Sequence, residues 1–262
     1  MLGSIRYYNC GFCTNQLAFA YKGHKPERRQ FPSGVFLIKH QTQGYTLFDT
    51  GYSREIYQCG LAGTLYGALN PTVVTAKDEI EAQLLEDGID PSEIKYVILS
   101  HLHPDHIGGV KFFPNATFIV SKETSELIGQ HSYRDIVFDQ LLPPWLESRL
   151  RVLSHDDLRG NRKSLLQGYD LFGDGSLFIT TLEGHTHGQI GAYIPGKLLL
   201  AADACWGEDL LEYSREMRVM ARFINADIRA FGDTIEQLIE VRDQGIRLCF
   251  SHDTYPESEL LP

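Results

Sequence analysis

The chain has 262 residues, of which 43% are hydrophobic, and a formal net charge of −10 from 24 Lys and Arg against 34 Asp and Glu. This size suffices for a folded domain with a buried core, and the negative charge argues against nucleic acid or an anionic membrane as a partner. No apolar run is long enough to span a bilayer, and the start does not resemble a signal peptide. Five scattered Cys are typical of reduced thiols, so we expect a cytoplasmic protein.

Short apolar runs bounded by turn residues predict the strands. In chain order these are a hairpin at 34–39 and 45–48, then single strands at 95–99, 116–120, 177–182, 190–194, 197–201 and 246–250. Helices are predicted at 75–87, where Thr75 and Asp78 match a capping-box pattern, and at 233–244, where apolar residues recur on one face. The stretch 122–150 is also predicted to be helical.

The predicted strands fall into two groups, and each group is followed by helices. This order favours an α/β fold in which helices cover the faces of sheets. No repeat, low-complexity tract or linker-like stretch interrupts the sequence. We therefore predict one domain over residues 1–262, with a helical insertion around residues 122–175.

One short segment, Ser100-His-Leu-His-Pro-Asp-His-Ile-Gly-Gly109, holds three imidazoles and a carboxylate directly after a predicted strand. His101 and His103 are two residues apart, which places both on the same face of an extended chain. Asp105 and His106 follow across a turn and can face a second point nearby. Imidazole and carboxylate are ligands of zinc and similar divalent metals, so the segment predicts a site for two cations side by side.

Three further ligand-type residues follow later predicted strands: His185, Asp203 and His252. Taken singly, each is more often a cap or a turn residue than a metal ligand. Together they lie at strand ends, and α/β folds build their sites at one shared edge of a sheet.

The order and the strand-end placement of these residues resemble the metallo-β-lactamase superfamily of hydrolases. The resemblance implies a four-layer αββα sandwich, the metallo-β-lactamase fold, with a dinuclear metal site. It implies His101, His103 and His185 as ligands of the first metal, Asp105, His106 and His252 as ligands of the second, and Asp203 as the bridging carboxylate. The implied cofactors are two divalent metal ions, with zinc favoured and iron or manganese as alternatives.

Within the superfamily, residues 90–109 are similar to the N-acyl-homoserine-lactone lactonases. The insertion at 122–175 and the short tail after His252 also favour that branch over glyoxalase II-type thioesterases. One position departs from the branch: Trp206 stands where those lactonases carry a Tyr near the substrate carbonyl. An indole N–H donates a hydrogen bond but is not an acid comparable to a phenol. His187 stands where Pro is common. It is predicted to contact the substrate or support a ligand, and the alternative is that it is only a turn residue.

The resemblance implies that a metal-bridging hydroxide opens a lactone or ester, with Asp105 and Trp206 as the catalytic side chains. Asp105 is predicted to carry a proton to the leaving oxygen, and Asp49, Ser100 and Gly184 to orient ligands. The alternative is a thioester hydrolase, either glyoxalase II-like or acting on a carrier-bound acyl group. A metal-binding sensor without activity ranks third, because all seven ligand residues are present.

The expected partner is a small acyl or lactone molecule, and the oligomeric state is left open, with a homodimer among the options. Cys10 and Cys13 have the spacing of redox and zinc sites. No second pair follows them, so a structural role as two thiols near a strand end is the favoured prediction.

Overall fold

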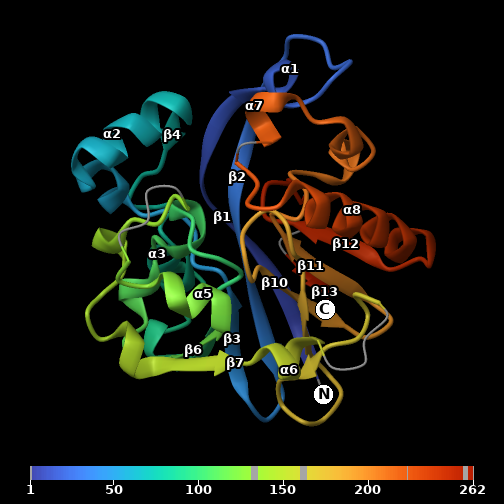
Figure 1. Ribbon diagram of the computed structural model, residues 1–262. Helices are drawn as coiled ribbons and strands as arrows, with labels where there is room; N and C mark the ends of the chain where they lie inside the picture. Colours follow the sequence, from blue (N-terminus) through green and yellow to red (C-terminus); the bar gives the residue numbers. More distant parts are fainter. Residues whose placement is uncertain (1, 131–134, 160–163, 223, 256–258, 262) are drawn as a thin grey trace. The chain divides into compact units, whose positions relative to one another are not determined.

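The computed structural model describes residues 2–130, 135–159, 164–222, 224–255 and 259–261 (Figure 1). The chain forms two compact units. The first comprises Met1–Cys13, Pro32–Leu153 and Thr254–Pro262, and the second comprises Thr14–Phe31 and Ser154–Asp253. Strands β1 and β2 both continue through a unit boundary.

The first unit is built on a sheet of eight strands. In spatial order they are β13 (Glu259–Leu261), β1 (Leu2–Gln16), β2 (Arg28–His40), β3 (Gly44–Phe48), β5 (Ile94–Ile98), β6 (Thr117–Ser121) and β7 (Leu150–Leu153), with β4 (Thr72–Val73) beside β1. β2 and β3 form the antiparallel hairpin predicted from the sequence. From β3 to β7 the strands are parallel, so β3 and β5 end at the same edge of the sheet.

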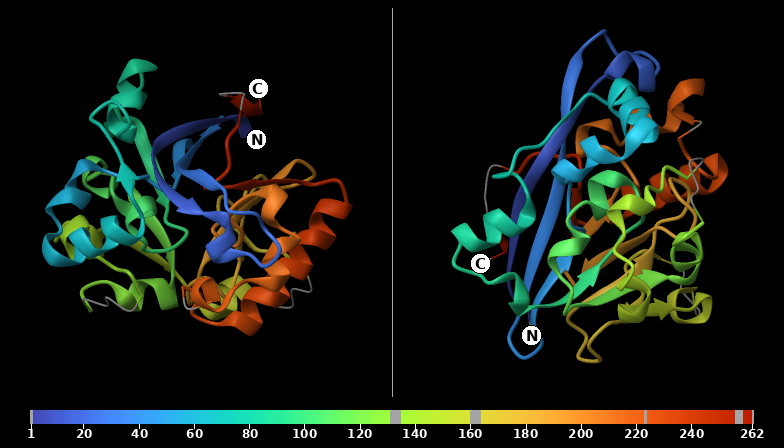
Figure 2. Two further views of the ribbon diagram at one scale, coloured as in Figure 1. Left: turned by 90° about the horizontal axis from the view of Figure 1, so that it is seen from above. Right: turned by 90° about the vertical axis from the view of Figure 1, so that its left-hand side faces the viewer.

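The helices of the first unit cover one face of this sheet, as Figures 1 and 2 show. They are α2 (Gly60–Leu69), α3 (Ile80–Glu86), α4 (Pro104–Ile107) and α5 (Lys122–Leu127). Ile80 and Leu84 of α3 share one core cluster with Leu47, Val97 and Phe118 of the strands. In the central strands, consecutive apolar residues are buried, so side chains on both faces of the sheet are covered. This pattern is typical of parallel strands.

The second unit holds a sheet of five strands: β12 (Arg247–Phe250), β11 (Leu198–Ala202), β10 (Ile190–Ile194), β9 (Phe178–Thr181) and β8 (Tyr169–Asp170). Its α-helices are α1 (Leu17–Ala20), α6 (His155–Arg159), α7 (Val219–Arg222) and α8 (Ile228–Asp243). β11 and β12 are parallel, and β10 runs opposite to both β9 and β11. The carboxyl ends of β9, β11 and β12 therefore lie at one edge.

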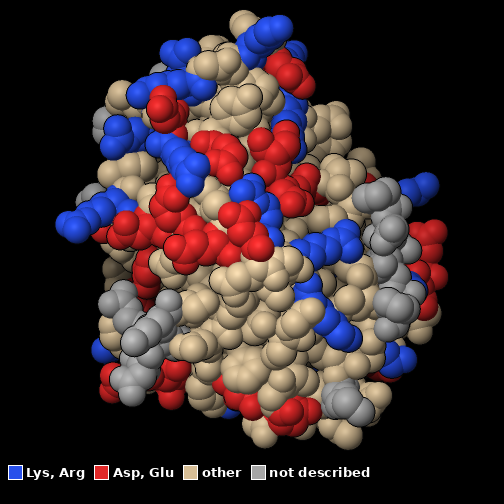
Figure 3. Space-filling view, turned by 90° about the vertical axis from the view of Figure 1, so that its right-hand side faces the viewer, with Lys and Arg blue, Asp and Glu red and all other residues tan. Residues whose placement is uncertain are grey.

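Helix α8 is amphipathic, with one apolar and one charged face. Its apolar residues Phe231, Ile235 and Leu238 are buried, whereas the opposite face carries charged residues. Asp227 caps its first turn, because the side chain accepts hydrogen bonds from the backbone N–H groups of Arg229 and Ala230. Figure 3, which views the side that carries α8, shows acidic and basic side chains interleaved there.

Short 3₁₀ turns make up much of the remaining described structure: η1 (Arg54–Gln58), η2 (Pro91–Glu93), η3 (Val110–Phe112), η4 (Asp139–Leu141), η5 (Leu146–Arg149), η6 (Glu208–Leu210) and η7 (Tyr213–Glu216). Among the described residues, no helix is both long and apolar enough to cross a lipid bilayer.

Two predicted helices differ from the structure. The helix predicted at 75–87 begins only at Ile80; the Asp78 carboxylate accepts from the backbone N–H of Thr75 and closes a turn ahead of it. The stretch 122–150 is only partly helical, with α5 followed by η4 and η5. Residues 131–134 and 160–163, inside the predicted insertion, lie outside the described residues.

Candidate metal centre

In the first unit, Asp49 organises the segment that carries the His cluster. It directly follows β3, in the left-handed conformation at φ 61°, and its side chain is fully buried. Its carboxylate accepts from the Ser100 backbone N–H and the Ser100 hydroxyl, both at 2.8 Å, and its Oδ2 lies 2.8 Å from His106 Nδ1. Burial raises the pKa of Asp49, against the opposing influence of these three contacts.

These contacts determine which nitrogen each ring presents. A carboxylate only accepts, so His106 carries its proton on Nδ1. The Ser100 hydroxyl donates to Asp49 and therefore accepts from Nδ1 of His101, 2.9 Å away. Both rings thus use Nδ1 for support and keep Nε2 as the nitrogen that can bind a metal.

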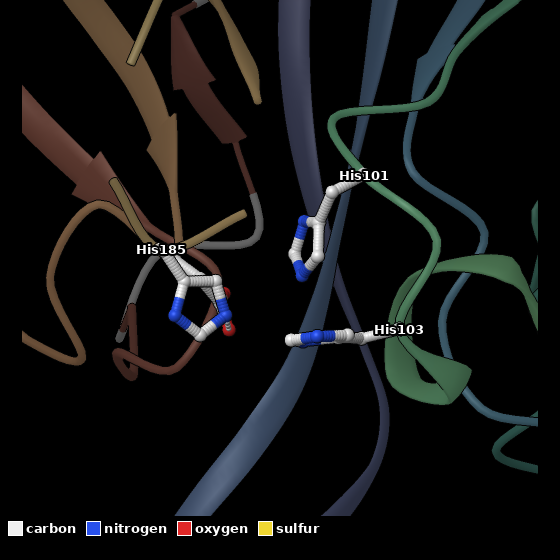
Figure 4. Close-up of side chains that lie close together, drawn as sticks. His101, His103 and His185 are labelled. Carbon is white, nitrogen blue, oxygen red and sulfur yellow. Dashed lines mark ion pairs between the residues drawn. The ribbon is translucent and has the colours of Figure 1, made fainter. Parts of the chain in front are cut away.

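The His101 ring packs against the rings of His103 and His106. The His101 ring centroid lies 4.4 Å from that of His103 and 4.1 Å from that of His106. Ligand atoms of His101 and His103 lie within 4.8 Å of each other, as do those of Asp105 and His106. In Figure 4 the rings of His101 and His103 project to the same side from the segment between β5 and α4. The predicted pairing of same-face His residues is confirmed within this unit.

Helix α4 can approach the turn after β3 because two glycines face it. A Cβ on Gly108 would lie 2.4 Å from the backbone N of Ser53, and one on Gly109 would lie 2.6 Å from the Thr50 carbonyl oxygen. Ser33 fixes the other side, since its hydroxyl donates to the backbone carbonyl of Asp105 at 2.6 Å. The Gly-Gly pair that closes the motif is therefore required by close packing.

A pair of tyrosines lies beside Asp105. The hydroxyls of Tyr52 and Tyr66 are 2.7 Å apart. Burial, and next the Asp105 carboxylate, raise the pKa of Tyr52 well above its ordinary value.

In the second unit, the three predicted ligands follow the strands that end at one edge. His185 follows β9, Asp203 follows β11 and His252 follows β12. All three are buried. Oδ2 of Asp203 lies 2.9 Å from Nε2 of His252 and 3.5 Å from Nε2 of His185. A single carboxylate oxygen is thus shared by two imidazoles, as a bridging ligand would be.

His185 is oriented by Asn225. Its Nδ1 lies 3.1 Å from Asn225 Oδ1, while Asn225 Nδ2 donates to the sulfur of Met217 at 3.6 Å. A thioether can only accept, which supports this orientation of the amide and a proton on His185 Nδ1. The His185 loop is also held by its backbone, because the N–H of Ala226 donates to the His185 carbonyl and that of Asp227 to the Gly184 carbonyl.

The donor set of each unit fits a divalent metal. Nε2 of His185 lies 3.5 Å from Asp203 Oδ2, and Nε2 of His106 lies 3.8 Å from Asp105 Oδ2. In the neutral form with the proton on Nδ1, each ring presents the lone pair of this Nε2. Two acceptors that face each other in a buried site repel unless a cation lies between them. Each unit therefore carries one set of donors suited to a cation.

The remaining predicted site residues lie in the second unit. Trp206 is half-buried, and its ring meets those of Tyr21 and Phe31 edge to face, at 6.0 and 6.2 Å. His187 is exposed and interacts electrostatically with Asp227, the cap of α8. Gly184 has φ 123°, and a Cβ there would lie 2.1 Å from the backbone N of Phe231, which explains why glycine is needed.

Sequence analysis did not identify Asn225 or Phe31. Asn225 lies 40 residues from His185 in the sequence, and nothing in its neighbourhood marks it as a partner of that ring. Phe31 reads as one apolar residue of a strand, yet its ring lies 6.0 Å from that of His252. Only tertiary structure brings these pairs together. Cys10 and Cys13 are both buried, and burial raises the pKa of the Cys10 thiol, consistent with a structural role.

The comparison with known proteins identifies the family. The model of the metallo-beta-lactamase superfamily matches residues 28–244. The chain belongs to this superfamily, and the predicted α/β fold with two sheets is confirmed as the metallo-β-lactamase fold.

Similar proteins are named as lactonases. The chain is 31% identical over 191 residues to the N-acyl homoserine lactonase AttM of Azorhizobium caulinodans, covering 69% of this chain and 67% of that protein. It is 28% identical over 190 residues to the N-acyl homoserine lactonase AiiB of Agrobacterium fabrum, covering 67% and 63%.

Solved structures share the fold. An N-acyl homoserine lactone hydrolase with N-hexanoyl-L-homoserine bound at its catalytic metal centre has a TM-score of 0.75 at 22% identity, covering 97% of this chain and 94% of that chain. The dizinc quorum-quenching lactonase AidC has a TM-score of 0.65 at 18% identity, covering 98% and 87%.

Loss of the Asn225 side-chain amide should weaken metal binding. Asn225→Leu keeps the side-chain size but removes the acceptor that holds the His185 proton on Nδ1, so we expect metal affinity to fall by about 10- to 100-fold. Asn225→Asp restores an acceptor and should bind metal more tightly than Asn225→Leu. Competition with a chromogenic chelator measures both. Equal affinities for the wild type and Asn225→Leu would contradict the assigned role.

Proposed function

We propose that the protein is a metal-dependent hydrolase that opens a lactone or ester, and that the donors of the two units complete one dinuclear centre. One observation carries the proposal: in each unit, Nε2 of a buried imidazole lies 3.8 or 3.5 Å from a buried carboxylate oxygen. Family membership and the order of the ligands along the chain support combining the two donor sets.

The proposed ligand assignment follows the superfamily. The first metal takes His101, His103 and His185, the second takes Asp105, His106 and His252, and Asp203 bridges the two. Zinc is the proposed metal because imidazole and carboxylate suit it and because AidC is described as a dizinc enzyme. Iron and manganese accept the same ligands and are the alternatives to test.

When bound, two divalent ions supply Lewis acidity and lower the pKa of a shared water towards 7. The side chains of the chain provide the rest. Asp105 is proposed to carry a proton to the leaving oxygen, with its backbone held by the Ser33 hydroxyl. Asp49, Ser100 and Asn225 hold the rings in one tautomer, so that the ligands need no rearrangement during turnover.

The proposed substrate is a small acyl compound with a lactone or ester bond, such as an N-acyl homoserine lactone. The names of AttM and AiiB support this class. Trp206 and His187 are proposed to contact the substrate, with Trp206 donating a hydrogen bond in place of a phenol. All five cysteines are unpaired by disulfides and buried, which supports the proposal of a reducing, cytoplasmic location. The thioesterase alternative lacks comparable support.

A turnover screen of the metal-loaded protein tests the proposal. Protein loaded with zinc, iron or manganese is offered lactones and esters of graded acyl length and thioesters monitored with a thiol reagent. We expect hydrolysis of at least one lactone series, no comparable thiol release, and loss of activity after metal removal by a chelator. The His103→Ala variant, prepared identically, is the control for contaminating hydrolases. Wild-type turnover by His103→Ala would refute the dinuclear centre.

A further inference from the structure

Arg29, at the start of β2 in the second unit, joins three segments that are far apart in the sequence. Its Nη1 donates to both carboxylate oxygens of Asp209, at 2.9 and 2.7 Å. Its Nη2 lies 3.7 Å from Oδ1 of Asp253. The Arg29 side chain is 20% exposed and that of Asp209 is 63% exposed, so the guanidinium is largely shielded from solvent while its partner is not.

The turn that carries Asp209 is shaped to receive the guanidinium. Gly207 has φ 156°, and a Cβ there would lie 2.9 Å from Nη2 of Arg29. The backbone N–H of Glu208 donates to Oδ2 of Asp253 at 3.0 Å. Arg29, the turn at 207–209 and Asp253 therefore form one interlocked cluster, in which each member contacts the other two.

The cluster adjoins two proposed site residues. Gly207 directly follows Trp206, and Asp253 directly follows His252. The Arg29 guanidinium also lies over the Phe31 ring, 5.7 Å from its centroid. Phe31 in turn meets Trp206 at 6.2 Å and His252 at 6.0 Å, both edge to face. Arg29 is thus linked to both Trp206 and His252 in two ways. It contacts the residues that follow them in the chain, and it packs on the Phe31 ring that touches both.

We propose that Arg29 is a positioning residue that fixes the indole of Trp206 relative to the imidazole of His252. The part that concerns substrate turnover rests on the proposed function; the packing of Trp206 does not. The Arg29 guanidinium pairs with Asp209 through Nη1, approaches Asp253 through Nη2 and lies over the Phe31 ring at the same time. A lysine ammonium is a point charge and cannot make the same set of contacts.

The environment of Trp206 gives a readout that is independent of turnover. The chain has two Trp, and Trp145 lies in the first unit beside Phe118. In a Trp145→Phe background, all indole emission comes from Trp206. Arg29→Ala and Arg29→Lys are made in this background. Asp209→Asn removes the same ion pair by changing its exposed member. This variant keeps the proposal testable if the Arg29 variants fail to fold.

Arg215 supplies the matched control. It also pairs bidentately with a carboxylate in the second unit, that of Glu236, with both contacts at 2.7 Å. It makes no contact with Phe31 or the turn at 207–209 among the interactions of the described residues. Arg215→Ala should therefore leave Trp206 emission and turnover unchanged.

The proposal expects Arg29→Ala and Asp209→Asn to shift Trp206 emission to the red and to increase its quenching by acrylamide. Arg29→Lys should fall between Arg29→Ala and the parent. On the best substrate of the screen, Arg29→Ala should lower kcat/KM by about tenfold or more, since small misplacements at a site are costly. Unchanged emission and quenching in folded Arg29→Ala and Asp209→Asn would overturn the positioning role. Absence of turnover by the parent would instead count against the proposed function alone.

Discussion

Replacing Asp203 with Asn is expected to abolish tight metal binding and to lower kcat/KM by more than about 100-fold. Loss of a residue that only supports a metal ligand typically costs about 10- to 100-fold, so the effect of losing a ligand should be larger. The reason is that Oδ2 of Asp203 faces both His185 and His252. An amide keeps the shape of the carboxylate but not its charge. Metal analysis of purified protein and steady-state kinetics measure the two effects.

The fold should survive this substitution. A buried carboxylate that faces imidazole nitrogens is costly without a cation, so metal-free Asp203→Asn should unfold at a temperature no lower than the metal-free wild type. Asp233→Asn, at an exposed position on α8, is the control and should change neither property. Two bound metals and wild-type kinetics in Asp203→Asn would rule out its bridging role.

Replacing Asp49 with Ala should have the largest effect on stability. The substitution removes the acceptor of the Ser100 backbone N–H, the Ser100 hydroxyl and the His106 ring, all buried. These buried groups would be left without a partner, and Ala adopts the left-handed backbone conformation of residue 49 less readily than Asp. Together the two effects should lower the free energy of unfolding by about 3–5 kcal/mol. Urea unfolding of the metal-free protein measures the change.

Asp49→Asn separates the loss of the carboxylate's hydrogen bonds from the strain of the left-handed backbone. It keeps one acceptor and tolerates the left-handed backbone, so it should be less destabilised than Asp49→Ala. Asp78→Ala is the control, since Asp78 accepts a hydrogen bond in an exposed turn. If Asp49→Ala unfolded at the same urea concentration as the wild type, Asp49 would not organise the His segment.

The sequence was most informative where chemistry is local. His101, His103, Asp105 and His106 lie within six residues, and the short strand before them makes their relative placement predictable. His185, Asp203 and His252 were predicted as ligands because each follows an apolar run that the sequence marks as a strand. Family resemblance supplied the rest of the ligand assignment.

Other features depend on tertiary structure and left no local pattern. β1 has 15 residues but mixes polar and apolar residues without strict alternation, so no strand was predicted there. The helix predicted at 75–87 starts only at Ile80, although the Asp78 carboxylate accepts from the Thr75 backbone N–H as it would in a capping box. Asn225 and Arg29 act through residues distant in the sequence.

Strand β2 has a consequence for how this chain can vary in evolution. Phe31 lies against His252 in the second unit, and Ser33, two positions along, holds the backbone of Asp105 in the first. The period of a strand is two, and a shift of one residue turns every side chain to the opposite face. A single inserted or deleted residue between Phe31 and Ser33 would turn one of the two side chains to the opposite face, so the Phe31 and Ser33 contacts depend on the exact chain length between them.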